Sequence, residues 1–165
     1  ELMYLLPYGV MKYDSCDRDV ILNSVNTVRV TCENGVVEYE QMIRSPIDAY
    51  KWELVDRLRI LAELTGASLV VQDSYAGWPC REDSPLQQLC RQVYNRLTGQ
   101  ELKTEKVNSC AETGEIAGAI PNMDIVALAP WGRGAHTPRE HLDLDTLQPF
   151  WEFLTALLRA MCEEA

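Results

Sequence analysis

The first half of the chain contains two β-branched runs that predict a pair of strands. The runs cover residues 27–32 and 36–43, and Glu33-Asn34-Gly35 separates them. Asparagine and glycine tolerate the positive φ of a tight turn, so Asn-Gly between such runs is a strong signal for a β-hairpin. We therefore expect two antiparallel strands here.

A helical repeat of apolar residues follows this hairpin. Ser45 opens a capping signature with proline next and an acid three residues on. Leu54, Leu58 and Leu61, flanked by Val55 and Ala62, then recur at helical spacing. Gly66 ends the predicted helix, and residues 68–72, with the apolar Leu69, Val70 and Val71 at their centre, predict another strand. Hairpin, helix and strand make the first half an α+β unit.

The second half has a different rhythm, and the aperiodic residues 75–83 are the best candidate for a domain boundary. Ser84-Pro85-Leu86-Gln87 is a second capping signature, which opens a helix that ends before Gly99. The expected elements after it are a strand at 104–107, a short helix or turn at 113–119, a strand at 124–128 and a last helix from 147 to 161. This alternation predicts an α/β layer with a largely parallel sheet.

The composition and net charge of the chain argue against some classes of binding partner. The chain has 165 residues, of which 47% are hydrophobic, and a net charge of −10; nucleic acids and anionic membranes both attract basic surfaces, so neither is an expected partner. No run approaches the roughly 18 apolar residues of a membrane span. The six cysteines form no C-x-x-C pair, as expected for reduced thiols in a cytoplasmic protein. The chain begins at Glu1 without an initiator Met, so we expect it to be part of a longer protein.

Both histidines lie in one loop, at residues 129–141, directly after the last predicted strand. Gly134 lets this backbone bend sharply and approach a ligand. His136 is therefore placed like a metal ligand or a general base, although a loop histidine that only hydrogen-bonds gives the same pattern. His141 lies in a polar stretch, and we expect it to be exposed.

One histidine cannot complete a metal site, because a catalytic zinc needs about three protein ligands. No carboxylate lies at a recognised spacing from His136. Arg44, at the end of the second hairpin run, is either a partner for a carboxylate or a surface arginine. Asn26, at the start of the first run, is either a ligand contact or a turn former.

Several short segments, taken in order, carry a resemblance to a known family. They are Leu6-Pro7-Tyr8-Gly9-Val10-Met11, Asn23-Ser24-Val25-Asn26-Thr27, Ile43-Arg44-Ser45, Gly77-Trp78, Asp83-Ser84-Pro85-Leu86, Met123-Asp124-Ile125-Val126 and Gly134-Ala135-His136-Thr137-Pro138. Together they resemble the bacterial aminoacyl-histidine dipeptidases, also called cytosolic non-specific dipeptidases. Each motif is weak alone, but the ordered set covers nearly the whole chain and is specific.

The resemblance implies a di-zinc metallopeptidase in which a lid domain interrupts an α/β catalytic domain. Residues 1–80 would be the C-terminal half of the lid, and residues 81–165 the C-terminal part of the zinc-binding catalytic domain. His136 matches the histidine that binds one of the two zinc ions in such enzymes. The other ligands and the catalytic groups would lie in the N-terminal half, so we expect no catalytic residue in this chain and no hydrolysis by it alone.

The resemblance also implies contacts with the substrate. Arg44 matches a lid arginine that grips the C-terminal carboxylate of the substrate, and Asn26 matches a lid asparagine near the substrate backbone. Asn108, Glu112 and Gly134 match positions that border the substrate pocket.

The sequence departs from the family pattern beside this pocket. Asn108 stands where the family has a histidine, Cys110 where it has a glycine, and Arg139 where it has an acid, although Glu140 remains. These changes bear on specificity and on activity.

The expected function is hydrolysis of unblocked dipeptides, Xaa-His among them, by metal-activated water in the cytoplasm. A dipeptide and the N-terminal half of the same protein are the expected partners, and homodimer formation is left open. The departures motivate an alternative, a divergent non-catalytic homologue that binds peptides or forms dimers. A tripeptidase or deacylase of the same superfamily is a third reading.

Overall fold

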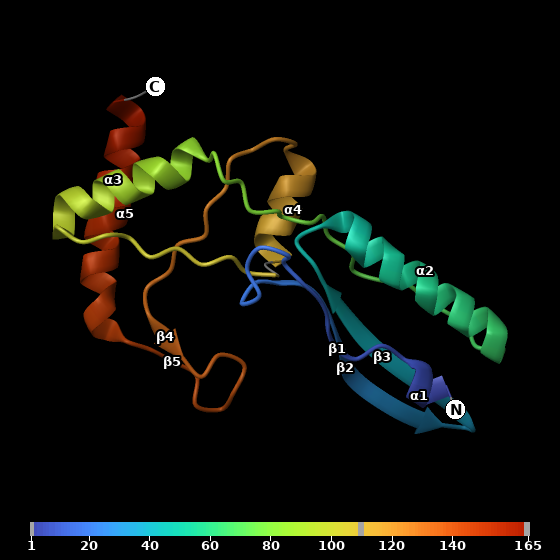
Figure 1. Cartoon of the computed structure of the whole chain (residues 1–165). Helices are drawn as coiled ribbons and strands as arrows, with labels where there is room; N and C mark the ends of the chain where they lie inside the picture. The colour runs from blue at the N-terminus through green and yellow to red at the C-terminus, as the bar shows by residue number, and fades with distance from the viewer. Residues whose placement is uncertain (1, 109–110, 164–165) are drawn as a thin grey trace. The chain divides into compact units, whose positions relative to one another are not determined.

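The computed structural model describes residues 2–108 and 111–163, and the chain divides into two compact units (Figure 1). Glu1–Cys80 and Glu105–Met123 form the first unit, and Arg81–Thr104 and Asp124–Ala165 form the second. One border between the units follows residue 80, and the segment 105–123 belongs to the first unit although it comes later in the chain.

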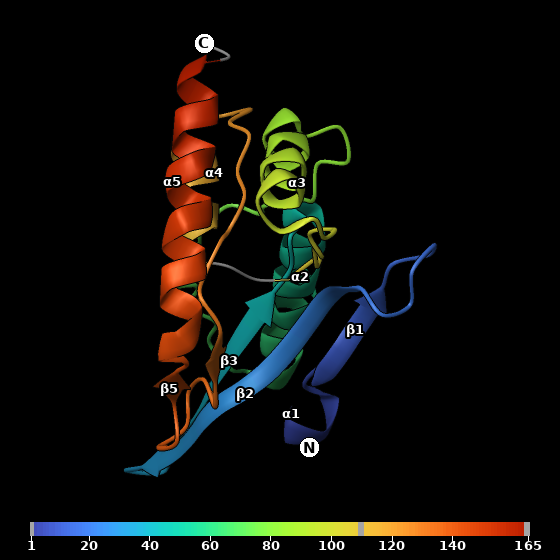
Figure 2. The ribbon, with the colours of Figure 1, turned by 90° about the vertical axis from the view of Figure 1, so that its left-hand side faces the viewer.

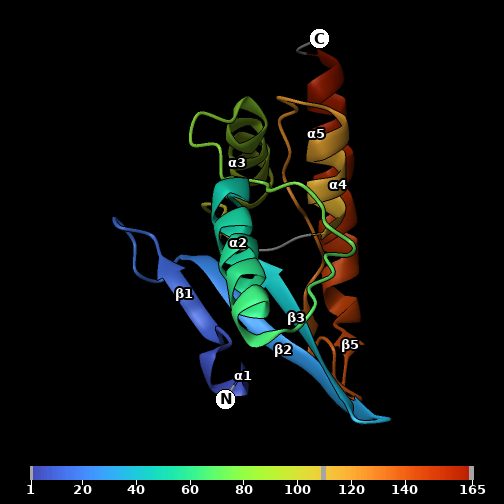
Figure 3. The ribbon, with the colours of Figure 1, turned by 90° about the vertical axis from the view of Figure 1, so that its right-hand side faces the viewer.

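The first unit contains a three-stranded antiparallel sheet, in the order β1-β2-β3. Its strands are β1 (Gly9–Tyr13), β2 (Ile21–Glu33) and β3 (Val36–Arg44), and a short helix, α1 (Leu2–Leu5), precedes them. The turn between β2 and β3 has positive φ at Asn34 (51°) and Gly35 (78°), which confirms the predicted hairpin. The β2–β3 hairpin extends well beyond the end of the helix at residues 48–65, α2 (Figure 3). Neither β1 nor α1 was predicted.

Helix α2 (Asp48–Thr65) packs on the sheet beneath Val25, whose side chain is fully buried. Its buried apolar residues are Leu54, Val55 and Leu58, at the predicted helical spacing. The helix begins two residues later than the sequence indicated. Ser45 is not its N-cap, because the Ser45 hydroxyl donates to the Leu22 carbonyl at 2.6 Å and accepts the Ile47 N–H at 3.1 Å. Ser45 therefore closes a local turn that ties the start of the helix to β2.

The second unit is built on two helices that pack across one another, α3 (Pro85–Thr98) and α5 (Leu147–Glu163) (Figure 1). The Ser84 hydroxyl accepts the Gln87 N–H at 2.9 Å, which confirms the predicted N-cap. The shared core consists of Leu89, Cys90, Val93, Phe153 and Leu157. A single-turn 3-10 helix, η1 (Leu144–Thr146), leads into α5.

Three predicted strands are absent from the part of the chain that the structure describes, namely those at 68–72, 104–107 and 124–128. Both described sheets are antiparallel, so the expectation of a largely parallel sheet is wrong for these residues. A strand exists only through hydrogen bonds to a neighbour, and an apolar run does not reveal whether that neighbour is present. Val126 and Leu128 of the last run are partly buried and pack against the α3–α5 core without forming a strand.

The remaining elements are α4 (Ala111–Ala119) in the first unit and the short strands β4 (Gly132–Arg133) and β5 (His141–Leu142) in the second (Figure 2). The fold is therefore a mixed α/β arrangement with a strand hairpin and helices, as predicted. None of the described helices is long and apolar enough to cross a membrane.

Candidate functional site

The face of the sheet that points away from α2 collects polar side chains. Residues directly opposite each other on antiparallel strands project to the same face, and the face alternates along a strand. Asn23 faces α2, because its Nδ2 donates to the Tyr50 carbonyl of that helix at 2.9 Å. Ser24 pairs with Arg44 in the β2–β3 register, so both project to the opposite face together with Asn26.

Asn108 joins this polar face from a distant part of the chain. Its Nδ2 donates to the Ser24 Oγ at 3.1 Å, across a sequence separation of 84 residues. Asn108 is half-buried and lines a small recess with residues of the 75–78 segment. The structure thus brings Asn26, Arg44 and Asn108, all predicted as substrate contacts, to one side of the sheet.

The Arg44 guanidinium has no carboxylate partner within residues 2–108 and 111–163. Its Nε donates to the Met42 sulfur at 3.3 Å, and a thioether is a weak acceptor. A half-buried arginine with most of its donors unused suits a planar carboxylate, which it can bind with two parallel hydrogen bonds. Asn26 is exposed, and no described residue forms a hydrogen bond with its side chain.

A buried lysine holds the wall of the recess in place. The Lys51 ammonium donates to the Tyr75 carbonyl and lies 2.8 Å from Asp48 Oδ1. The same carboxylate oxygen accepts the Gly77 N–H at 2.7 Å. Gly77 has no room for a side chain, because a Cβ there would stand 2.4 Å from the Pro46 carbonyl oxygen. These contacts fasten the 75–78 segment to the start of α2.

This arrangement changes the acidity of Asp48. Partial burial acts to raise the pKa of Asp48, but the hydrogen bonds from Lys51 and from the Gly77 N–H outweigh it and lower the pKa below its usual range. The carboxylate is therefore ionised at neutral pH, and it links the helix to the segment.

Helix α4 places Glu112 in its first turn, where the side chain is exposed. The helix packs closely on the 75–78 segment, because a Cβ at Gly114 would stand 2.6 Å from the Ala76 carbonyl oxygen. Cys110, a position where the sequence departs from the family, lies outside the described residues. Glu112 thus follows Asn108 closely in the chain and belongs to the same unit.

His136 lies at the tip of a small hairpin in the second unit, between β4 and β5. The loop is closed by its own hydrogen bonds, since the Thr137 N–H and hydroxyl both donate to the Gly134 carbonyl, at 3.0 and 2.7 Å. Gly134 has a φ of +67°, and a Cβ there would stand 3.0 Å from the Arg139 carbonyl oxygen. His136 itself has a φ of +63°. Its imidazole is exposed and has no hydrogen-bond partner in the described part of the chain.

The base of this hairpin is tied to the start of α5. The Asp143 N–H donates to the Trp131 carbonyl at 2.9 Å, and the Trp131 N–H donates to the Thr146 hydroxyl at 3.0 Å. The exposed His141 ring is also fixed, because Nδ1 bonds the Arg139 carbonyl at 2.7 Å. A carbonyl only accepts, so Nδ1 carries the proton. These hydrogen bonds fix the base of the β4–β5 hairpin, and His136 lies at its tip.

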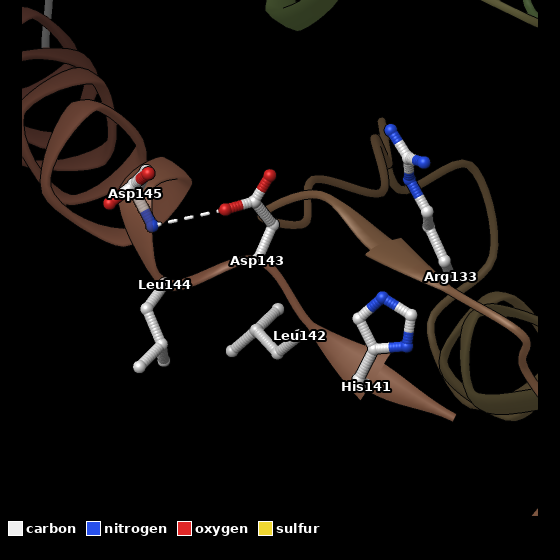
Figure 4. Close-up of a pocket in the computed structure, with 6 residues that line it drawn as sticks. All are labelled: Arg133, His141, Leu142, Asp143, Leu144 and Asp145. Carbon is white, nitrogen blue, oxygen red and sulfur yellow. Dashed lines mark hydrogen bonds between the residues drawn. The ribbon is translucent and has the colours of Figure 1, made fainter. Parts of the chain in front are cut away.

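An open depression lies beside this base (Figure 4). It is lined by Arg133, His141, Leu142, Asp143, Leu144 and Asp145. The Asp143 carboxylate is occupied by the Asp145 N–H at 3.2 Å (Figure 4). His136 is not among the lining residues, so this depression is not the site that the sequence predicted.

The residues present do not form a complete metal site. Within the described residues, no group of three or more His, Cys, Asp or Glu side chains could hold a metal ion. His136 fits the role of one ligand, because its ring is exposed and unbonded on a loop with a fixed backbone. A full coordination sphere needs donors from outside the described chain.

The sequence-predicted residues thus fall into two groups. Asn26, Arg44, Asn108 and Glu112 belong to the first unit, and Gly134 and His136 belong to the second. Sequence reasoning did not assign roles to Ser24, which bonds Asn108, or to Lys51, which holds the recess wall. Ser24 belongs to the Asn23–Thr27 motif that carries the family resemblance. Lys51 lies in a helical repeat, where the local sequence gives no sign that a lysine is buried.

Comparisons with known proteins extend the resemblance seen in the sequence. The model of peptidase family M20/M25/M40 matches residues 9–160. The chain is 31% identical over 158 residues to the cytosol non-specific dipeptidase of Escherichia coli (strain K12), and this match covers 96% of the chain and 33% of that protein. The crystal structure of aminoacylhistidine dipeptidase from Vibrio alginolyticus matches with a TM-score of 0.77 at 31% identity, over 96% of this chain and 32% of that one.

Both relatives are dipeptidases by name, and the chain spans only a third of the length of each (33% and 32%). The family match covers the sheet, the α3–α5 core and the His136 loop. The chain belongs to peptidase family M20/M25/M40.

Proposed function

We propose that this chain is the C-terminal part of a metallodipeptidase that hydrolyses unblocked dipeptides. The match to two dipeptidases over 96% of the chain is the observation that carries the proposal. The first unit would contain the end of the lid, and the second unit the end of the catalytic domain. Because residues 2–108 and 111–163 hold no complete metal site, we expect the chain to be inactive without the rest of the protein.

The polar face of the sheet is the part that would contact substrate. Arg44, with no carboxylate partner in the described chain, would bind the C-terminal carboxylate of a dipeptide. Asn26 and the Asn108–Ser24 pair would lie along the substrate backbone, where amide and hydroxyl groups can donate and accept. Glu112 of the first unit and Gly134 of the second are also proposed as substrate contacts. A free carboxylate is thus the substrate feature on which this site depends.

His136 would contribute one ligand to a metal centre, for which we propose zinc. A bound pair of zinc ions supplies a water molecule of lowered pKa and stabilises negative charge on a carbonyl oxygen. The remaining ligands and the general base would come from the N-terminal half. A cytoplasmic location is part of the proposal, and the name of the Escherichia coli relative, a cytosol dipeptidase, supports it.

A non-catalytic homologue is the competing function; the Asn108 departure motivates it, but the matches to two dipeptidases do not favour it. The family has a histidine at this position, and an asparagine amide cannot exchange protons as an imidazole does. The Asn108 Nδ2 donates to the Ser24 Oγ, so the residue links two distant parts of the first unit. A protein that binds dipeptide and metal without turnover would be this homologue.

The test compares free dipeptides with their C-terminal amides, using the gene product that contains this chain. We expect kcat/KM to favour the free dipeptide by about a hundredfold, since the amide removes a charge-assisted pair with Arg44. Arg44→Met should abolish this preference. Arg29→Met is the matched control, because the Arg29 guanidinium already pairs with Glu40 at 3.0 Å.

Equal turnover of acid and amide would refute the assigned role of Arg44. Metal binding without turnover of any dipeptide would establish the non-catalytic homologue. Tripeptides and N-acylated dipeptides belong in the same panel, because faster turnover of either class would identify a tripeptidase or a deacylase.

A further inference from the structure

The backbone of His136 adopts a conformation that L-residues seldom use. Its φ of +63° lies in the left-handed region, where the Cβ crowds the neighbouring carbonyl oxygen. Such a residue persists only where surrounding contacts hold it, and these residues concentrate at functional sites. The contacts that hold this backbone therefore set the direction of the His136 Cα–Cβ bond, from which the imidazole extends.

The Glu140 carboxylate supplies the contact that acts on His136 directly. The His136 N–H donates to Glu140 Oε2 at 2.9 Å. No other described residue accepts this N–H. Glu140 is anchored in turn, because its own N–H donates to the Thr137 carbonyl at 3.0 Å. The side chain thus reaches back across the loop and fixes the peptide group of His136 from an anchored position.

We propose that Glu140 is a positioning residue for His136. By accepting the His136 N–H, it holds the left-handed backbone and thereby the direction of the Cα–Cβ bond that carries the imidazole. The functional part of this proposal rests on the proposed role of His136 as a metal ligand. Metal ligands are effective when their direction is fixed before the ion arrives, and hydrogen bonds around them provide that fixation.

A second role for Glu140 has to be separated from positioning. Its carboxylate has two oxygens, and Oε1 is a chemically suitable ligand for a divalent ion. Glutamine distinguishes the two roles, since its amide oxygen still accepts an N–H although it is a poor ligand for a divalent ion. Alanine removes both functions.

The experiment uses the isotope-labelled, zinc-free gene product that contains this chain, and its Glu140→Gln and Glu140→Ala variants, in solution NMR. Two signals are followed: the solvent exchange of the His136 amide proton, and the shift of the His136 ring protons during titration with zinc chloride. His141 is the internal reference for the ring signals, because its Nδ1 already bonds the Arg139 carbonyl. Glu101→Ala changes an exposed carboxylate on the same unit and serves as the control variant.

We expect Glu140→Ala to speed exchange of the His136 amide by about tenfold, as loss of a charge-assisted hydrogen bond predicts. The zinc concentration needed to shift the His136 ring should rise by a similar factor. Glu140→Gln should stay within about twofold of the unaltered chain in both signals, because a neutral acceptor preserves the bond. Glu101→Ala should change neither signal.

Unchanged amide exchange in Glu140→Ala would overturn the positioning role. A Glu140→Gln chain with a protected amide but no zinc response would also overturn it, and would make Glu140 itself a ligand. If the unaltered gene product shows no zinc response at the His136 ring while Glu140→Ala frees the amide, the Glu140 bond is supported and the metal role of His136 fails.

Discussion

Replacing Lys51 by methionine tests whether one buried ammonium fastens the recess wall to α2. The Lys51 side chain is 11% exposed, whereas that of Asp48 is 51% exposed. Methionine keeps the apolar stem but removes the donor to the Tyr75 carbonyl and the ion pair with Asp48. The hydrogen bond to the Tyr75 carbonyl is largely buried and involves a charged donor. The ion pair with Asp48 is weaker, because solvent screens the half-exposed carboxylate.

The expected loss of stability follows from these exposures. A hydrogen bond to a charged group contributes about 1.5–3 kcal/mol, and a half-exposed ion pair adds less than about 1 kcal/mol. The methionine variant does not have to desolvate an ammonium group on folding, and this offsets part of the lost stability. We therefore expect Lys51→Met to lower the free energy of unfolding by about 2 kcal/mol, or Tm by about 4–8 °C for a chain of this size.

Urea unfolding followed by circular dichroism measures the change, and amide exchange at Gly77 localises it. Gly77 should lose protection, because Asp48, the acceptor of its N–H, is no longer held by Lys51. Lys103→Met is the matched control, since Lys103 is exposed. If both variants unfold at the same urea concentration and Gly77 stays protected, Lys51 does not hold the wall.

Three further predictions concern the wall and the second core. Gly77→Ala should cost about 3 kcal/mol or more, since a Cβ at this position overlaps fixed backbone, and Gly132→Ala, with 3.4 Å of clearance, should be tolerated in the same urea assay. Phe153→Ala should cost about 3–5 kcal/mol by opening a cavity between α3 and α5, whereas Trp151→Ala, at an exposed position, should cost far less by thermal denaturation. Asp48 has a lowered pKa, so its contribution to stability is complete above about pH 4 and is lost as the pH falls through the folded-state pKa. An acid titration followed at the Gly77 amide signal should therefore show release of the 75–78 segment. A Gly77 signal that stays unchanged below that pH would contradict the role of Asp48.

Local features of the fold were predicted well from the sequence. Asn34-Gly35 predicted the hairpin because the turn needs positive φ at both positions, and both have it. Ser84 predicted the start of α3 because its hydroxyl reaches the N–H of Gln87, three residues on, without help from the rest of the fold. In each case the determining contacts lie within a few residues.

Features that depend on distant partners were predicted less well. The runs 68–72 and 124–128 were expected to be strands, but no described strand pairs with them. Asn108 was identified as a site residue from its motif, but its bond to Ser24, 84 residues away, depends on the return of 105–123 to the first unit. No local pattern contains that information.

The most direct test of the metallodipeptidase proposal is the metal content and dipeptide turnover of the gene product containing this chain, compared with its His136→Ala and His141→Ala variants. The proposal predicts that His136→Ala loses bound zinc and at least about a hundredfold in kcat/KM, because a coordinating imidazole is gone. His141→Ala should keep both. Full metal content and full turnover in His136→Ala would contradict the proposal.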